Sequence, residues 1–323
     1  MPIEKSVLVP LGADETFTLI TEPGRLRRWQ AITARVDLRA GGDYRWTIVP
    51  GHSAAGTITE VEPGRHVVFT WGWEGIDEVS AVTITLEPSA GGTMVRLVHD
   101  GLAGEQEASH AEGWDHYLGR LAEAAAHGDA GPDEWGAAPP ELDAITSAEA
   151  TLAICQRVLW GVAQADYGSP TVCPEFTVAQ LADHLIGSVT GLGGAVGAEF
   201  PEVTATELEP RLAAAAQPAL EAWNRRGLDG DVKLGPSELP ATSAAGILSI
   251  EFLVHAWDFA RATGQQVSVP DQLAEHVLGI ARTVITPEGR RRGAFAEALP
   301  TGPDARTMDR LIAYTGRAQQ TAP

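Results

Sequence analysis

The hydrophobic period of this chain changes near residue 128, and this change restricts the folds that it can adopt. Before that point, β-branched and aromatic residues alternate with polar ones between Gly and Pro turns, which is typical of antiparallel strands. Beyond residue 141, apolar residues recur every three or four positions in segments rich in Ala and Leu, as in helices. Residues 128–141, GDAGPDEWGAAPPE, separate the two parts and have the composition of a linker. We therefore predict two domains, residues 1–127 and 142–323.

The length of the chain agrees with two domains, and its net charge argues against two classes of binding partner. The chain has 323 residues, more than the roughly 100–200 of a typical single domain. Its 23 Lys and Arg residues are outnumbered by 43 Asp and Glu residues, and the formal charge of −20 argues against binding to nucleic acids or anionic membranes. No apolar run approaches the roughly 18 residues of a membrane span, and no signal peptide is recognisable. We expect a soluble, cytoplasmic protein, and the sequence does not indicate its oligomeric state.

The first domain is predicted to be of the α+β class, with an antiparallel sheet followed by one long helix. Two short helices are predicted at 13–20 and 23–29, and the long helix extends from about 106 to 127. The long helix carries an apolar stripe that includes Trp114 and should face the sheet. The predicted strands are 4–10, 32–38, 41–49, 55–63, 66–73, 79–88 and 92–101.

The motifs of this domain follow one another in a characteristic order. They are TEPGRLRRW, AGGDYRW, GTITEVEPGRHVVFTWGW, GGTMVRLVHDGL and GWDHYLGRL. Together they resemble the START-like (SRPBCC) superfamily, in the branch related to the activator of Hsp90 ATPase, over about residues 3–127. The resemblance implies a helix-grip fold, in which a curved sheet wraps around the long helix and encloses a hydrophobic cavity. Members of the superfamily include ligand carriers, cyclases and resistance proteins, so the fold does not determine the function.

Aromatic side chains would line such a cavity. Alternation along the strands places them on one face of the sheet, toward the helix. They would suit a flat, apolar, aromatic or polycyclic ligand, although aromatic residues that face a helix also serve simply as a core. His99 alternates with Val95 and Leu97, and could point inward as a general acid or base. The predicted ligand-binding residues are Trp46, Phe69, Trp71, Trp73, His99 and Trp114.

The second domain is predicted to be an all-α bundle of four or five helices. One start signal is clear, because TVAQ (177–180) has the pattern of a capping box. A later segment, SIEFLVHAWDFARATG (249–264), carries Glu251, His255 and Asp258 inside an apolar run. An ionised carboxylate in such a setting is unfavourable unless it is paired or bound to a metal. The predicted helical segments are 144–164, 177–197, 208–226, 243–264 and 270–285.

Three of these polar residues have the spacing and chemistry of a metal site. Glu251 and His255 are four residues apart and therefore share one helix face, and His184 lies beside the buried side of the helix that starts near 177. Imidazole and carboxylate are ordinary ligands of Zn²⁺, and three protein ligands leave one position open in a catalytic site. Asp258 could orient His255 or cap a neighbouring helix. The alternative is a core without metal, in which the imidazoles are hydrogen-bonded and Glu251 pairs with an arginine.

A second resemblance favours the metal. The segments VCPEFTVAQLADHLIG, LSIEFLVHAWDFARATGQ and DARTMDRLIAYTGR resemble the bacterial DinB-like superfamily, in particular the group with a mycothiol-dependent maleylpyruvate isomerase metal-binding domain. The resemblance covers about residues 143–318. In that family a His on the second helix and a Glu and a His four apart on a later helix hold the metal, and they correspond to His184, Glu251 and His255. The resemblance implies Zn²⁺, with Ni²⁺ as an alternative, and mycothiol as a thiol co-substrate.

The two resemblances together predict a metal-dependent thiol transferase or isomerase. In the second family, mycothiol binds the metal and adds to an electrophile, so we expect the START-like domain to capture a hydrophobic substrate and the bundle to present the thiol. Two other functions remain open. One is a binding or self-resistance protein that sequesters a hydrophobic metabolite, and the other is a START-like cyclase or dehydratase with an accessory metal domain. The sequence does not identify the substrate or the thiol, and does not say whether the two domains share an active site.

Overall fold

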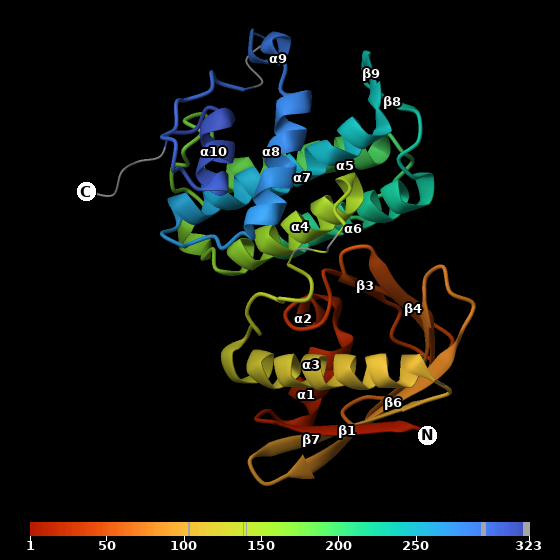
Figure 1. The fold of residues 1–323 in the computed structure, drawn as a ribbon. Coiled ribbons are helices and arrows are strands. Elements are labelled where there is room, and N and C mark those ends of the chain that lie inside the picture. Colours follow the sequence, from red (N-terminus) through yellow and green to blue (C-terminus); the bar gives the residue numbers. More distant parts are fainter. Residues whose placement is uncertain (103, 138, 140, 292–294, 319–323) are drawn as a thin grey trace. The chain divides into compact units, whose positions relative to one another are not determined.

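The computed structural model describes residues 1–102, 104–137, 139, 141–291 and 295–318 (Figure 1). The chain divides into two compact units, which we call the first unit (Met1–Asp133) and the second unit (Glu134–Pro323). Each unit has a hydrophobic core of its own.

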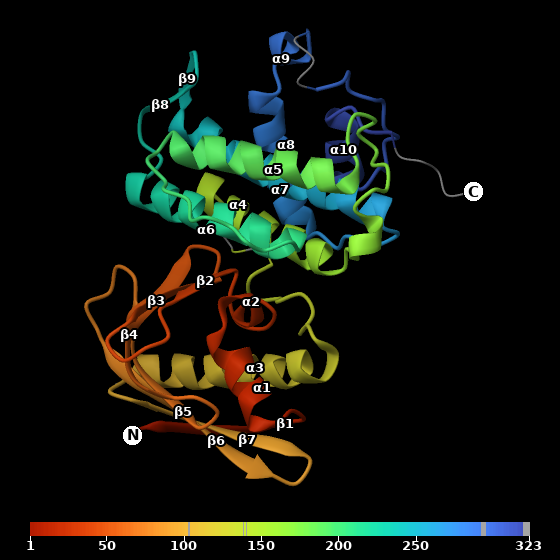
Figure 2. The ribbon, with the colours of Figure 1, turned by 180° about the vertical axis from the view of Figure 1, so that it is seen from behind.

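The first unit is a seven-stranded antiparallel sheet that curves around one long helix, α3 (Glu105–His127) (Figure 2). Two short helices, α1 (Ala13–Thr21) and α2 (Pro23–Leu26), connect the first two strands. The strands pair in the order β1-β7-β6-β5-β4-β3-β2, and all seven predicted strands are present. Their bounds are β1 Ile3–Val9, β2 Thr33–Val36, β3 Asp43–Val49, β4 His52–Glu62, β5 His66–Trp73, β6 Ser80–Ser89 and β7 Gly92–Asp100. This is the START-like helix-grip arrangement that the sequence predicts.

Alternation along the strands fills the space between the sheet and α3. On β5 the side chains of Val67, Phe69 and Trp71 are buried and their neighbours are less so. The apolar stripe of α3, which includes Trp114 and Leu121, is buried in the same core. Strands β5, β6 and β7 bury alternate residues, as expected when one side of a sheet is covered, whereas β3 is buried continuously over residues 44–48.

Part of the segment predicted as a linker packs against the first unit. The amide of Ala130 donates to the carbonyl of Arg28 at 3.0 Å, and the Arg120 guanidinium donates to the carbonyl of Gly131 at 3.0 Å. The imidazole of His116 contacts the Asp133 carboxylate at 2.9 Å. Residues 128–133 therefore continue the first unit, and residues 138 and 140 of the predicted linker lie outside the described residues.

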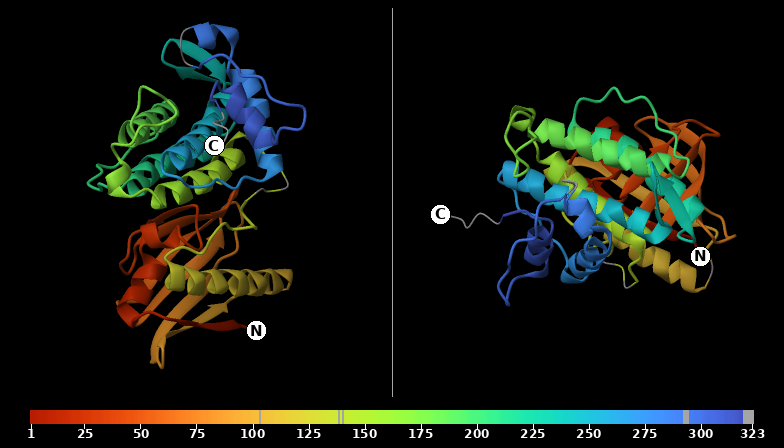
Figure 3. Two further views of the ribbon diagram at one scale, coloured as in Figure 1. Left: turned by 90° about the vertical axis from the view of Figure 1, so that its left-hand side faces the viewer. Right: turned by 90° about the horizontal axis from the view of Figure 1, so that it is seen from above.

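The second unit is built mainly from helices (Figure 3). Each of the five predicted helical segments overlaps one helix, and α7 begins two residues earlier than predicted. Helix α7 contacts α4, α5 and α8, and is buried on most of its circumference. The five helices are α4 Ala144–Trp160, α5 Val178–Gly194, α6 Leu208–Arg226, α7 Ala241–Ala262 and α8 Asp271–Val284, and three shorter ones are the 3₁₀ helix Gln164–Asp166, α9 Pro287–Arg291 and α10 Thr307–Tyr314.

The prediction that this unit is entirely α-helical is wrong in one place. A β-hairpin of β8 (Asp231–Leu234) and β9 (Ser237–Pro240) lies between α6 and α7. Gly235, with φ of +58°, allows the turn between the strands because this backbone conformation is unfavourable for other residues. Strands of four residues are too short to leave a clear alternating pattern in the sequence. Among the described residues, no helix has the length and apolar character needed to cross a membrane.

Candidate functional site

The three predicted metal ligands come from two neighbouring helices of the second unit. Helix α5 begins with the predicted capping box, in which the Thr177 hydroxyl accepts from the amide of Gln180 and the Gln180 side chain accepts from the amide of Thr177. His184 lies two turns beyond this start. Its ring stacks on Phe176, with centroids 5.2 Å apart and planes inclined by 22°.

The structure brings His184, Glu251 and His255 together. One possible ligand atom from each residue lies within 4.8 Å of the other two, and Nε2 of His255 is 3.6 Å from Oε2 of Glu251. The two imidazole rings are perpendicular, with centroids 5.4 Å apart. Oε2 of Glu251 is buried and has no hydrogen-bond partner among the described residues. The three side chains therefore present a converging set of nitrogen and oxygen donors.

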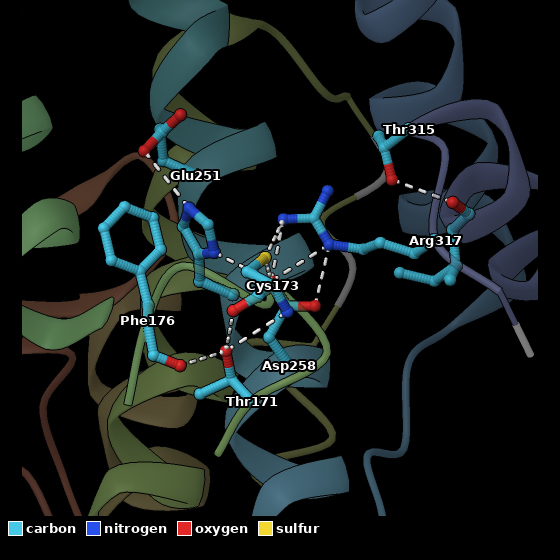
Figure 4. A network of polar contacts seen from close by, with 9 residues as sticks. Thr171, Cys173, Phe176, Glu251, Asp258, Thr315 and Arg317 are labelled. Atoms are coloured by element: carbon cyan, nitrogen blue, oxygen red, sulfur yellow. Dashed lines mark hydrogen bonds and ion pairs between the residues drawn. The ribbon is translucent and has the colours of Figure 1, made fainter. Parts of the chain in front are cut away.

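Asp258 contacts both His255 and Arg317, and Figure 4 shows the guanidinium of Arg317 beside its carboxylate. Its Oδ2 is 2.9 Å from Nδ1 of His255, which leaves Nε2 directed at Glu251. Of the two roles predicted for Asp258, the geometry matches the orientation of His255. Asp258 is fully buried, and it also accepts hydrogen bonds from the Arg317 guanidinium, from Nε to Oδ1 at 2.7 Å and from Nη2 to Oδ2 at 2.8 Å.

The charges of this cluster compensate one another. Burial opposes ionisation of Glu251, but the neighbouring His255, Ser188 and His184 outweigh it and lower the pKa of the carboxyl. Burial also opposes the charged form of His255, yet Asp258 and Glu251 raise the pKa of this imidazole to about 9. His255 is therefore protonated at neutral pH, and a metal ion would have to displace that proton.

Two residues near the cluster were not assigned to the site from the sequence. Arg317 follows α10 and reaches Asp258 across 59 positions of sequence. Cys173 lies 3.5 Å from Arg317 Nη2 and 3.7 Å from Asp258 Oδ2, in a loop held by the Thr171 hydroxyl. Cys173 is half-buried, and burial and Asp258 raise the pKa of its thiol to about 11. Both residues lie in motifs quoted above, but only the fold places them beside Asp258.

The six predicted ligand-binding residues of the first unit also lie together. Trp71 is central, with ring centroids 5.3 Å from Trp114, 5.5 Å from Trp73 and 5.9 Å from His99. The rings of Trp46 and Phe69 are 5.5 Å apart and adjoin the same group. All six except Trp73 are buried. We call these six residues the aromatic cluster.

Some polar groups inside the aromatic cluster form hydrogen bonds and others do not. Both ring nitrogens of His99 are engaged, since Nδ1 accepts from Trp114 Nε1 at 2.9 Å and Nε2 is 2.7 Å from the Ser80 hydroxyl. Burial, and to a smaller extent His110, lower the pKa of His99 to about 4. In contrast, the indole N–H groups of Trp46 and Trp71 are buried without a partner among the described residues.

His110 also lies beside this cluster. Its Nε2 accepts from Trp73 Nε1 at 3.0 Å, and its Nδ1 is 2.8 Å from the carbonyl of Gln106. No local sequence pattern indicates this contact, because Trp73 and His110 are 37 residues apart.

Comparison with known proteins relates the first unit to a described family. The family model described as "Activator of Hsp90 ATPase homolog 1-like protein" matches residues 11–126. Among solved structures, DynU16 of the dynemicin biosynthetic locus is 25% identical over 42% of this chain and half of its own, with a TM-score of 0.39. CalU16 from Micromonospora echinospora is 27% identical over 41% of this chain and 76% of its own, with a TM-score of 0.34.

Two curated relatives extend the comparison. The uncharacterized proteins Rv0738 and MT0763 of Mycobacterium tuberculosis are each 32% identical to this chain over 153 residues, which is 46% of this chain and 84% of the relative. The chain therefore belongs to the same family as these two mycobacterial proteins, and its first unit has the START-like (SRPBCC) fold of the Activator of Hsp90 ATPase homolog 1-like proteins.

Proposed function

We propose that the second unit binds one divalent metal ion through His184, Glu251 and His255, and that the chain is a thiol-dependent transferase or isomerase for a hydrophobic electrophile. The observation that carries the proposal is the convergence of the three ligand atoms within 4.8 Å of one another. The donor set suits Zn²⁺ best and Ni²⁺ next. Oε2 of Glu251 supports it further, because this buried oxygen accepts no hydrogen bond from the described residues and has only the 3.6 Å contact with His255, and a buried carboxylate is unfavourable unless it is paired or bound to a metal.

The surroundings of the ligands suit a catalytic ion. Three protein ligands leave a position free, where a divalent ion lowers the pKa of a thiol and makes it a nucleophile at neutral pH. Asp258 fixes the tautomer and orientation of His255, as the outer partners of zinc-bound histidines do. Arg317 in turn holds Asp258. The resemblance to the DinB-like, mycothiol-dependent group suggests mycothiol as the thiol.

We assign capture of the hydrophobic substrate to the first unit. The START-like fold supports this assignment, and so do the buried indole N–H groups of Trp46 and Trp71, which a ligand with an oxygen acceptor would satisfy. Acid–base catalysis by His99 is less favoured than binding. Both of its nitrogens are occupied, and its low pKa keeps it neutral near pH 7.

Metal analysis and adduct formation test the proposal in two steps. Purified full-length protein should contain about one equivalent of zinc by elemental analysis, and His255→Ala should lose it. His127→Ala is the matched control, because His127 is exposed and distant in sequence from the ligands. The metal-loaded protein should then form the adduct in which the mycothiol sulfur replaces the chlorine of 1-chloro-2,4-dinitrobenzene, with release of chloride and a proton, and His184→Ala should not.

Three results would separate the alternatives. Absence of any bound divalent metal ion from the wild-type protein would remove the basis of the proposal. Zinc without adduct formation, together with a hydrophobic molecule that co-purifies, would favour sequestration. An adduct formed equally well by His184→Ala would exclude the metal site from the reaction.

A further inference from the structure

An open cavity of about 480 Å³ lies in the second unit between α5, α7 and the β8–β9 hairpin. This volume lies within the range of roughly 300–1,000 Å³ that is usual for small-molecule sites. One of the lining residues is Glu251, so the cavity adjoins the candidate metal ligands. The lining residues are Gly187, Ser188, Gly191, Leu192, Ala195, Lys233, Leu234, Gly235, Ile247 and Glu251.

Two of the residues that α5 contributes to the lining are glycines. Gly187 and Gly191 are one turn apart inside the helix, and a Cβ atom added to either would meet nothing within 4 Å. Glycine inside a helix is less stable than alanine by roughly 0.5–1 kcal/mol, and no close contact requires glycine at these positions. The small residues therefore leave room along the cavity, while Leu192, Leu234 and Ile247 supply apolar surface.

Lys233 is the one cationic residue of this lining. The chain has only two lysines among its 23 basic residues and a formal charge of −20. The other lysine, Lys5, forms an ion pair with Asp115 at 2.6 Å. Lys233 is exposed, and no hydrogen bond or ion pair joins it to any other described residue. Glu238 stands opposite Lys233 in the hairpin register, but the two side chains do not form an ion pair.

We propose that this cavity binds a ligand with an anionic end and a short apolar body. Its carboxylate or phosphate group pairs with Lys233, and its body lies along the glycine wall of α5 toward Glu251. The inference rests on the proposed function, because it brings an anionic ligand to the metal site in addition to the hydrophobic electrophile that the first unit captures. An ammonium group suits both anions, since it acts as a point charge.

The scarcity of lysine allows a direct test on the full-length protein. Reductive methylation with ¹³C-formaldehyde keeps the positive charge and labels only the two lysines and the N-terminus. NMR spectra are recorded while hexanoate, hexyl phosphate or 1-hexanol is added. The Lys233 signal, assigned with Lys233→Met, should shift in a saturable way with one or both anions. The Lys5 signal is the internal reference and should not move.

Affinity measurements by calorimetry complete the test. The anionic probe should bind roughly tenfold or more tightly than 1-hexanol, as expected for a hydrogen bond to a charged group. Lys233→Met should abolish this preference, and Lys233→Arg should keep it. Gly191→Leu should weaken binding of the anion at least tenfold by filling the cavity. Gly279→Leu is its control, because Gly279 is also a helical glycine with open space around it but lies on α8.

Each outcome bears on one proposal separately. An unchanged Lys233 signal, or equal binding of 1-hexanol and the anions, would overturn the anion site. The titrations are repeated on protein treated with EDTA and on protein loaded with zinc. A shift of the Lys233 signal in protein that takes up no zinc would support the anion site and contradict the metal proposal. Zinc uptake without a shift of the Lys233 signal would support the metal proposal and contradict the anion site. The stronger of the two anionic probes identifies the carboxylate or the phosphate.

Discussion

Asp258 connects two cations that are far apart in the sequence. It holds Nδ1 of His255 at 2.9 Å and receives two hydrogen bonds on Oδ2 and one on Oδ1 from Arg317. The carboxylate is fully buried. Removal of one partner from a buried ion pair leaves the other charge uncompensated, so the cluster should respond strongly to small changes at this residue.

We expect Asp258→Asn to weaken both metal binding and folding. Zinc affinity should fall by roughly 10–100-fold, because His255 loses the group that orients it. The free energy of unfolding should fall by about 3–5 kcal/mol, because the Arg317 charge is left buried without its carboxylate. Zinc competition titrations and urea unfolding measure the two effects. Asp309→Asn, which disrupts a surface pair with Arg306, should leave both unchanged, and a zinc affinity of Asp258→Asn within twofold of wild type would argue against the positioning role.

His99 should make the first unit less stable in acid. Burial lowers its pKa from 6.5 to about 4, so between these values the unfolded chain takes up a proton that the folded chain does not. Stability is therefore greatest above pH 6.5 and decreases as the pH falls toward 4, by up to about 3 kcal/mol. Urea unfolding at several pH values should show this decrease, and His99→Gln should flatten it. An imidazole resonance of His99 that titrates near pH 6.5 would contradict the expectation.

At the scale of helices and strands, the elements that could be predicted are those marked by local sequence patterns. The capping box at Thr177 and the spacing of Glu251 and His255 are local, so the two helices and the side chains that they present could be predicted. The β8–β9 hairpin could not, because four-residue strands leave no alternating pattern. Arg317 could not be linked to Asp258 either, since that contact joins positions 59 residues apart and depends on how α10 packs against α8.

Helix α5 carries His184, so its N-terminal cap should influence the site. Thr177→Ala removes the side-chain acceptor of the capping box, and we expect a loss of about 1 kcal/mol in unfolding free energy. Zinc affinity should decrease by less than tenfold, because the ligand itself is unchanged. The matched control is Thr190→Ala on the same helix, where the exposed hydroxyl only donates to the carbonyl of Gly187. Urea unfolding compares the two variants, and equal stabilities would show that the cap is not important.

At the scale of the whole molecule, the two units have separate cores and separate candidate sites. The aromatic cluster and its polar partners lie within residues 1–133. The candidate metal ligands, Asp258, Arg317 and the cavity at Lys233 all lie within 134–323. We propose that the first unit captures the substrate and that the second unit carries out the thiol chemistry. This proposal predicts that the two activities can be separated by cutting the chain between the units.

A fragment that begins at residue 134 should bind zinc as the full-length protein does, in equal stoichiometry and with an affinity within about threefold. The cut is placed there because Arg120 and His116 tie residues 131–133 to the first unit, so an earlier cut would leave those groups without partners. The fragment should still form the adduct of mycothiol with small 1-chloro-2,4-dinitrobenzene. It should lose most of its kcat/KM for a bulky polycyclic electrophile, because the aromatic cluster that would bind such a molecule is absent. Equal kcat/KM values for the fragment and the full-length protein with the bulky substrate would show that the first unit does not capture it.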